Sequence, residues 1–95
     1  MAAYVIASVE VTDQAAYDEY RKGVLATVSK YGGKFLVRGG AVQRLEGNRD
    51  WNRVVVLEFA SAAAAKTWYE SPEYQPLAKL RQGASNSNLI IVEGA

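Results

Sequence analysis

Apolar and polar positions divide the chain into short runs with a period of two and longer segments with a period of three to four. Residues 4–11 are rich in β-branched side chains, which predicts a strand. Both alternating faces of this run are largely apolar, the face of Tyr4 and Ile6 as well as the face of Val5 and Val9. A strand with one solvated face alternates cleanly, so both of its faces are expected to become covered.

An amphipathic helix is predicted to follow Thr12 and Asp13, whose side chains can cap its first turn. One apolar stripe recurs at spacings of three and four, formed by Tyr17, Tyr20, Val24, Val28 and Tyr31. Gly32 and Gly33 end the helix, because glycine reaches the left-handed C-cap conformation without strain.

The middle of the chain, residues 34–59, predicts a long hairpin. Its parts are a strand over 34–38, a break or bulge at Gly39 and Gly40, a further strand segment over 41–45, a turn over 46–50 and a strand over 51–59. The last of these is the most apolar strand in the chain.

A second helical region follows Ser61, a good N-cap, and four consecutive alanines favour a helix from residue 62 to about 70. Pro72 either stops this helix or begins another turn, with Ser71 capping the junction. Beyond it, one helical face is shared by Tyr74, Leu77, Ala78 and Arg81. Residues 83–88 are predicted as a polar loop and residues 89–93 as the closing strand.

The predicted order β-α-β-β-α-β over residues 1–95 is a single domain of the α+β class with the ferredoxin-like plan. In this plan two helices cover one face of a four-stranded antiparallel sheet and leave the other face bare. Burying a large apolar side chain stabilises by roughly 1.5–3 kcal/mol, so we expect a homodimer that packs its open sheet faces together.

Composition narrows the function classes. The net charge is +1 with no basic run, which argues against a nucleic-acid partner. The chain has no cysteine and no histidine, which removes thiolate chemistry, the commonest general base and the usual haem ligand. No phosphate-binding loop, dinucleotide fingerprint or metal-ligand cluster is present, so no cofactor and no metal are predicted. The N-terminus resembles neither a signal peptide nor a membrane span, and a cytoplasmic location is expected.

The chain resembles the DUF1330 family throughout its length. The resemblance is carried by Gly32-Gly33, Arg38-Gly39-Gly40, Glu46-Gly47, the strand Arg53–Phe59, Trp68-Tyr69-x-Ser71-Pro72-x-Tyr74, Arg81 and Val92-Glu93-Gly94. It implies a dimeric α/β-barrel of uncharacterised function, in a group that includes cofactor-independent quinol monooxygenases, small isomerases and haem enzymes. The histidine that many of the haem branches use is absent here.

Two charged residues of the hairpin are candidate catalytic groups. Arg38 precedes two glycines that let a ligand approach the backbone, and its guanidinium could clamp a carboxylate or a developing oxyanion. Glu58, in a dry cavity, would be a candidate general base. The alternative is structural, because Arg38 could pair with Glu58 or Glu46, and Glu58 with Arg53.

The candidate ligand-binding residues are Arg38, Trp68, Tyr69, Tyr74 and Arg81. The aromatic side chains could hold a flat molecule, or they could belong to the core or a dimer interface. Arg81 lies on a mostly apolar stripe and needs either a carboxylate of the protein or an anionic ligand.

Two functions remain open on the sequence. One is a cofactor-independent enzyme acting on a small phenolic or acidic substrate, and the other is a non-catalytic ligand-binding or sensing homodimer. An RNA-binding module is disfavoured, because such modules stack bases on sheet aromatics and the central strand here carries valines.

Overall fold

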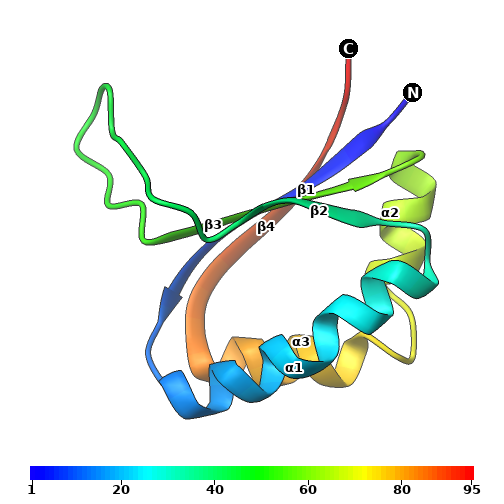
Figure 1. Ribbon diagram of the computed structural model, residues 1–95, viewed down its shortest axis with the longest axis horizontal. Helices are drawn as coiled ribbons and strands as arrows, with labels where there is room; N and C mark the ends of the chain where they lie inside the picture. The colour runs from blue at the N-terminus through cyan, green and yellow to red at the C-terminus, as the bar shows by residue number, and fades with distance from the viewer.

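The computed structural model describes residues 1–95 and places three helices on one face of a four-stranded antiparallel sheet (Figure 1). The strands are β1 (Ala3–Val11), β2 (Lys34–Arg38), β3 (Arg53–Phe59) and β4 (Ser85–Glu93). The helices are α1 (Gln14–Lys30), α2 (Ala62–Tyr69) and α3 (Gln75–Ala84). The sheet order β2-β3-β1-β4 confirms the ferredoxin-like plan, with the second helical region divided into α2 and α3.

The predicted caps set the ends of α1. The Asp13 side chain accepts a hydrogen bond from the Ala16 amide at 3.2 Å, which satisfies one of the free donors of the first turn. The helix ends at Lys30, and Gly32 adopts a φ of 78°. This left-handed conformation favours glycine.

Ser71 makes the junction between α2 and α3. Its hydroxyl donates to the Trp68 carbonyl at 2.7 Å and accepts from the Tyr74 amide at 3.1 Å. This side chain therefore stabilises the turn between the two helices, as predicted, and Pro76 stands within the first turn of α3.

The prediction of a polar loop over residues 83–88 is wrong. Helix α3 continues to Ala84, and β4 begins at once with Ser85, which pairs with Val11 of β1. The polar side chains of this stretch have partners inside the fold: Ser87 accepts a hydrogen bond from Arg81, and Asn86 donates to Glu10 at 3.0 Å. Satisfied polar groups let a strand form without apolar alternation.

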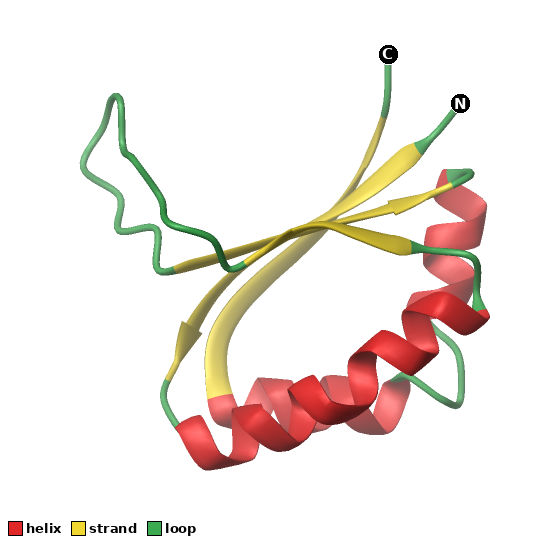
Figure 2. Cartoon of the chain, viewed as in Figure 1, coloured by secondary structure: helices red, strands yellow, loops and turns green.

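The strand segment predicted over 41–45 is also absent, and β3 begins at Arg53 rather than at residue 51. Residues 39–52, called the arm below, contain no helix or strand and project from the sheet (Figures 1 and 2). Val42, Leu45 and Trp51 of the arm are exposed, Leu45 to 91%. These apolar side chains are not buried against the rest of the chain, and the arm does not extend the hydrogen-bonded pairing of β2 with β3.

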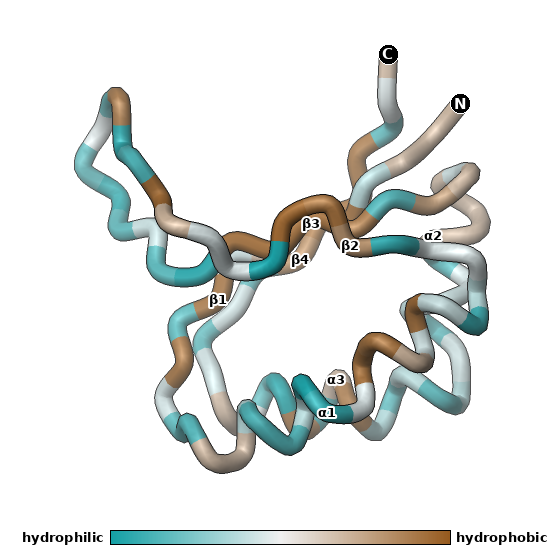
Figure 3. The backbone as a smooth tube through the Cα atoms, viewed as in Figure 1, coloured by the Kyte–Doolittle hydropathy of each residue, from teal (hydrophilic) through white to brown (hydrophobic).

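The two faces of the sheet differ. The face toward the helices buries Val5, Val9, Leu57 and Phe59 in the main core. The other face, called the open face, has no covering layer of helices (Figure 3). Its apolar members are Tyr4, Ile6, Val37, Val54, Val56, Ile90 and Val92. None of the helices combines the length and apolar character that crossing a bilayer requires.

Candidate functional site

A cavity lies between the sheet and the helices, with its mouth open to solvent. It encloses about 490 Å³ including the mouth, of which about 30 Å³ is reached by the centre of a water molecule. Its apolar wall consists of Val5, Ala7, Val9, Val24, Phe35, Val55, Leu57, Trp68 and Leu89, with Tyr17 and Tyr20. Four arginines complete the lining, so we call it the arginine cavity.

The four arginines come from four different elements: Arg21 from α1, Arg38 from β2, Arg53 from β3 and Arg81 from α3. No carboxylate lines the cavity. Arg21 lies 3.7 Å from Asp18, with both side chains about half exposed. The other three make no ion pair within 4.0 Å, so the cavity concentrates positive charge that the protein does not neutralise locally.

A β-bulge turns Arg38 toward the cavity. Phe35 pairs with Leu57 and Arg38 pairs with Val55, with one extra residue, Leu36, in β2 between them. In a regular strand, residues three apart would face opposite sides of the sheet, whereas the bulge places both on the side of the helices. The Arg38 guanidinium then lies over the Phe35 ring, 4.4 Å from its centroid.

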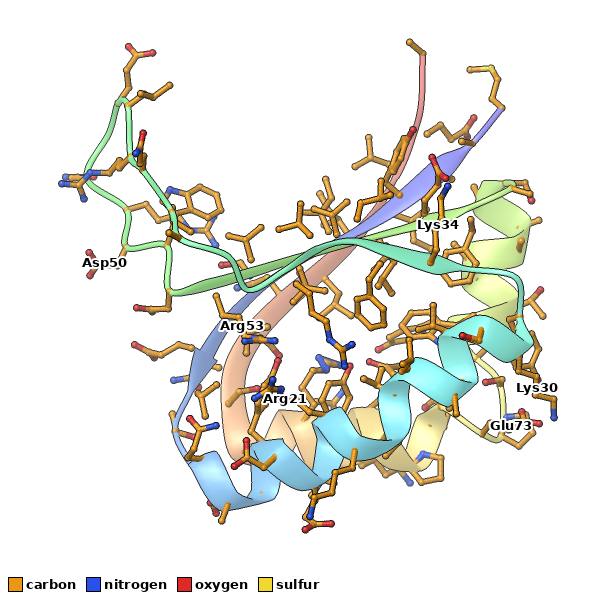
Figure 4. The ribbon with its side chains drawn as sticks, in the orientation of Figure 1. Arg21, Lys30, Lys34, Asp50, Arg53 and Glu73 are labelled. Atoms are coloured by element: carbon orange, nitrogen blue, oxygen red, sulfur yellow. The ribbon has the colours of Figure 1, made fainter.

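The Arg53 guanidinium occupies the space that Gly39 leaves free. A Cβ atom on Gly39 would lie 2.4 Å from Nη1 of Arg53, and Gly39 adopts a φ of 73°. The space beside this glycine, predicted to admit a ligand, is therefore filled by the Arg53 side chain. Arg53 also lies 5.6 Å from the Tyr17 ring centroid, and its buried Nε has no hydrogen-bond partner. Figure 4 shows Arg53 and Arg21 pointing toward one another between β3 and α1.

Arg81 is the most deeply placed of the four, with only 3% of the residue exposed. Its Nη1 donates to the Ser87 hydroxyl at 3.1 Å, and its Nε is buried without a partner. The sequence left open whether a protein carboxylate or a ligand meets Arg81, and the structure places no carboxylate beside it. Removing a charged group from water costs several kcal/mol, and a paired opposite charge ordinarily offsets this cost.

Trp68 belongs both to the core and to the cavity wall. It is 1% exposed, lines the cavity and donates from Nε1 to the Thr27 hydroxyl at 3.0 Å. Tyr74 stacks behind it, with ring centroids 4.1 Å apart, and does not reach the cavity. The Tyr74 hydroxyl instead lies 2.9 Å from the hydroxyl of Tyr20, which does line the cavity. Burial raises the pKa of both phenols, most strongly that of Tyr20, so both stay protonated.

Two predicted site residues lie elsewhere. Tyr69 lines a separate apolar groove beside β4, with Leu89, Ile90 and Ile91. Glu58 faces away from the helices and forms an ion pair with Lys34 on the neighbouring strand at 3.1 Å. The predicted pairing of Glu58 with Arg38 or Arg53 is therefore wrong, because the alternation of β3 turns Glu58 away from both arginines.

Sequence reasoning missed Arg53, Arg21 and Tyr20 as cavity residues. A signal for Arg53 was present, since it keeps the period of two with Val55, Leu57 and Phe59 on the helix side of β3. Arg21 likewise lies four residues from Tyr17 on the inward stripe of α1. The structure brings these residues together with Arg38, Trp68 and Arg81 from the predicted set.

The fold and this cavity define a ferredoxin-like α+β protein with a basic internal site. The chain belongs to the family described as domain of unknown function DUF1330, whose model matches residues 2–95. Among curated proteins, no match was found.

Solved structures share the fold. A protein of unknown function from Rhodopseudomonas palustris, RPA0582, has a TM-score of 0.82 at 23% identity, covering 99% of this chain and 82% of its own. A dimeric ferredoxin-like protein of unknown function from Jannaschia sp. CCS1 has a TM-score of 0.72 at 13% identity, covering 99% and 100%. SnoaB, a cofactor-independent oxygenase from Streptomyces nogalater, has a TM-score of 0.63 at 16% identity, covering 99% and 92%.

Proposed function

We propose that this protein binds a small acidic organic molecule in the arginine cavity. The observation that carries the proposal is Arg81, a buried guanidinium whose only hydrogen bond goes to a serine hydroxyl. Buried charges in proteins are ordinarily paired, and a ligand carboxylate would pair with this one. The carbon skeleton of the ligand would lie against Val55, Leu57 and Trp68.

The dimensions of the cavity limit the ligand. Small-molecule sites usually occupy about 300–1,000 Å³, and the enclosed part of this cavity is far smaller than that. Only about 30 Å³ of the cavity accepts the centre of a water molecule, so a ligand of more than a few atoms requires a lining side chain to move. Arg38 is the side chain best placed to do so, because it is exposed at the cavity mouth and makes no ion pair.

A thermal-shift screen tests the proposal, using small carboxylates, phenols, quinols and lactones on the wild type, Arg81→Met and Lys79→Met. Lys79 is the matched control, since it lies on α3 but is exposed. A ligand at 100 times its Kd adds about 2.7 kcal/mol, which moves Tm by roughly 4–8 °C for each kcal/mol in a domain of this size. Carboxylates should stabilise the wild type and the control but not Arg81→Met. If no acid stabilises the wild type, the proposal fails.

Catalysis is the second candidate, and the likeness to a cofactor-independent oxygenase is what favours it. Arg38 would then stabilise an oxyanion, and Tyr20, held protonated by burial, would donate a hydrogen bond to it. Binding is preferred because the polar groups of the lining are guanidiniums and phenols, which donate protons rather than accept them. Glu58 could act as a base only on a substrate that reaches the open face.

Turnover of any ligand that emerges from the screen would decide between the two functions. The enzyme would convert the ligand in a chromatographic assay, and Tyr20→Phe would lower that rate while leaving the ligand's Kd within about twofold. A ligand that is bound and returned unchanged over long incubation supports the binding function.

We also propose that two copies associate through their open faces. Val37, Ile90 and Val92 on this face are 41%, 55% and 41% exposed. Each large apolar side chain covered would contribute roughly 1.5–3 kcal/mol, and the Jannaschia protein of the same fold is described as dimeric. Equilibrium sedimentation should show a dimer at micromolar concentration and a monomer for Val56→Asp, which buries a charge in the contact. A folded wild-type monomer under these conditions would refute the dimer.

A further inference from the structure

Three of the cavity arginines form two groups with different surroundings: Arg81 is one group, and Arg53 with Arg38 is the other. Arg81 is tied to β4 through Ser87. Arg53 lies over Gly39, on the side of the sheet where β2 ends and where Arg38 enters the cavity. Neither group contains a carboxylate, and a buried Nε without a partner occurs in each, on Arg81 and on Arg53. Each group is therefore a separate place for an anion.

The strand register separates the two groups. Arg53 and Ser87 both pair with Val9 of β1, from opposite sides. Their backbones are thus two interstrand spacings apart, roughly 9–10 Å. Gly39 draws the Arg53 guanidinium away from β1, toward β2, while Ser87 holds Arg81 at β4. A carboxylate contacts a guanidinium through hydrogen bonds of about 2.7–2.9 Å, so two separate anionic groups match this spacing of the backbones better than a single carboxylate does.

Between the two groups the wall is apolar. Val9 stands between Arg53 and Ser87 in the sheet, and Val55 and Leu89 line the same region. These side chains offer contact to methylene or aromatic carbon and no hydrogen bonds. Across the sheet from β3 to β4, the lining therefore consists of a cationic group, an apolar surface and a second cationic group.

We infer that the ligand carries two anionic groups joined by a short apolar spacer, one bound by Arg81 and the other by Arg53 and Arg38. This rests on the proposed binding function and names its ligand class, a small dicarboxylate. The surface at the mouth carries Arg21, Lys22 and Arg38 against one carboxylate, Asp18, and its net positive charge favours entry of a dianion over a monoanion. Arg53 thereby determines specificity, and Arg81 supplies the site common to any acid.

The test measures binding by titration calorimetry at constant ionic strength. Glutarate and its monomethyl ester share one carbon skeleton and differ in one negative charge. Succinate and adipate shorten and lengthen the spacer. The wild type should bind one of the dicarboxylates at least tenfold more tightly than glutarate monomethyl ester. Arg53→Gln should lower that preference to less than threefold, because the dicarboxylate loses more affinity than the monoester does. Arg38→Gln, at an exposed position, should lower the preference in the same direction and serves if Arg53→Gln unfolds.

The outcomes separate this inference from the function on which it rests. If none of the three dicarboxylates binds the wild type more tightly than glutarate monomethyl ester, or if Arg53→Gln and Arg38→Gln lose affinity for the preferred dicarboxylate and for the monoester equally, the two-anion ligand is overturned and the binding of monoacids stands. Binding of neither compound, together with no stabilisation by any acid in the thermal screen, would overturn the proposed function itself.

Discussion

Replacing Arg81 by methionine should stabilise the protein in the absence of ligand. Arg81 is 3% exposed, and one hydrogen bond, to Ser87, is all that its guanidinium makes with the protein. Methionine has similar length and flexibility and would fill the same space without a charge. Replacing buried ionic groups by apolar residues of similar volume is often stabilising by about 1–4 kcal/mol.

The neighbouring arginines add to this effect. Like charges in one cavity repel one another, and Arg53 and Arg38 line the same cavity as Arg81. Against this stands the lost hydrogen bond to Ser87, since hydrogen bonds to charged groups contribute about 1.5–3 kcal/mol. The balance for Arg81→Met is a gain of about 1–3 kcal/mol, and even 1 kcal/mol raises Tm by roughly 4–8 °C.

The assay is urea unfolding, followed by circular dichroism at one protein concentration, for the wild type, Arg81→Met and Lys79→Met. The control should stay within about 0.5 kcal/mol of the wild type, as surface substitutions do. The gain should also shrink for Arg81→Leu, whose shorter side chain leaves space unfilled. A loss of more than about 1 kcal/mol in Arg81→Met would refute the reasoning, because Arg81 would then hold α3 to β4 as a structural residue.

Three further results are expected. Ser87→Asp puts a carboxylate beside Arg81, so Tm should rise and acid binding should fall, and a calorimetric titration that still finds wild-type affinity would count against Arg81 as the anion site. Gly39→Ala should destabilise by about 1–2 kcal/mol, because its Cβ meets Arg53 and a positive φ strains alanine, whereas Gly40→Ala, with open space around it, should change urea unfolding little. Hydrogen bonds from Lys30 and Tyr31 lower the pKa of Glu73 to about 2, so this contact stabilises above pH 4.5 and is lost as pH falls toward 2. Acid unfolding of Glu73→Gln should lack that part of the pH dependence.

Periodicity and turn chemistry were enough to predict the fold. The stripe from Tyr17 to Val28, the Asp13 cap and the Ser71 junction are local signals, and the structure contains each of them where the sequence places it. The polar start of β4 runs against local pattern, because its environment is set by partners outside the strand, Glu10 and Arg81. The apolar residues of the arm predict a strand, but Val42, Leu45 and Trp51 stay exposed.

The site was harder to predict than the fold, because it depends on register. Arg38 and Arg81 could be identified as candidates from their neighbours in sequence. The bulge at Leu36, which turns Arg38 toward the helices, could not be predicted from the spacing of residues. The separation of Glu58 from the arginines follows from simple alternation along β3 and could have been read in advance. Tyr74 and Tyr69 belong to one sequence motif, but Tyr74 packs behind the cavity wall and Tyr69 lines the separate groove beside β4.

The distribution of carboxylates argues that the charge of the cavity is a property of the site. The chain has 10 acidic residues for 11 basic ones, so neutralising partners are available. Only Asp18 lies beside a cavity arginine, the half-exposed Arg21, and the other ion pairs are on the outside: Glu73 with Lys30, Glu58 with Lys34 and Glu19 with Lys22. Inside, the groups that position the arginines are neutral: a serine for Arg81, a glycine for Arg53 and a phenylalanine ring for Arg38. Such partners orient a guanidinium without cancelling its charge, which keeps that charge available to an anionic ligand.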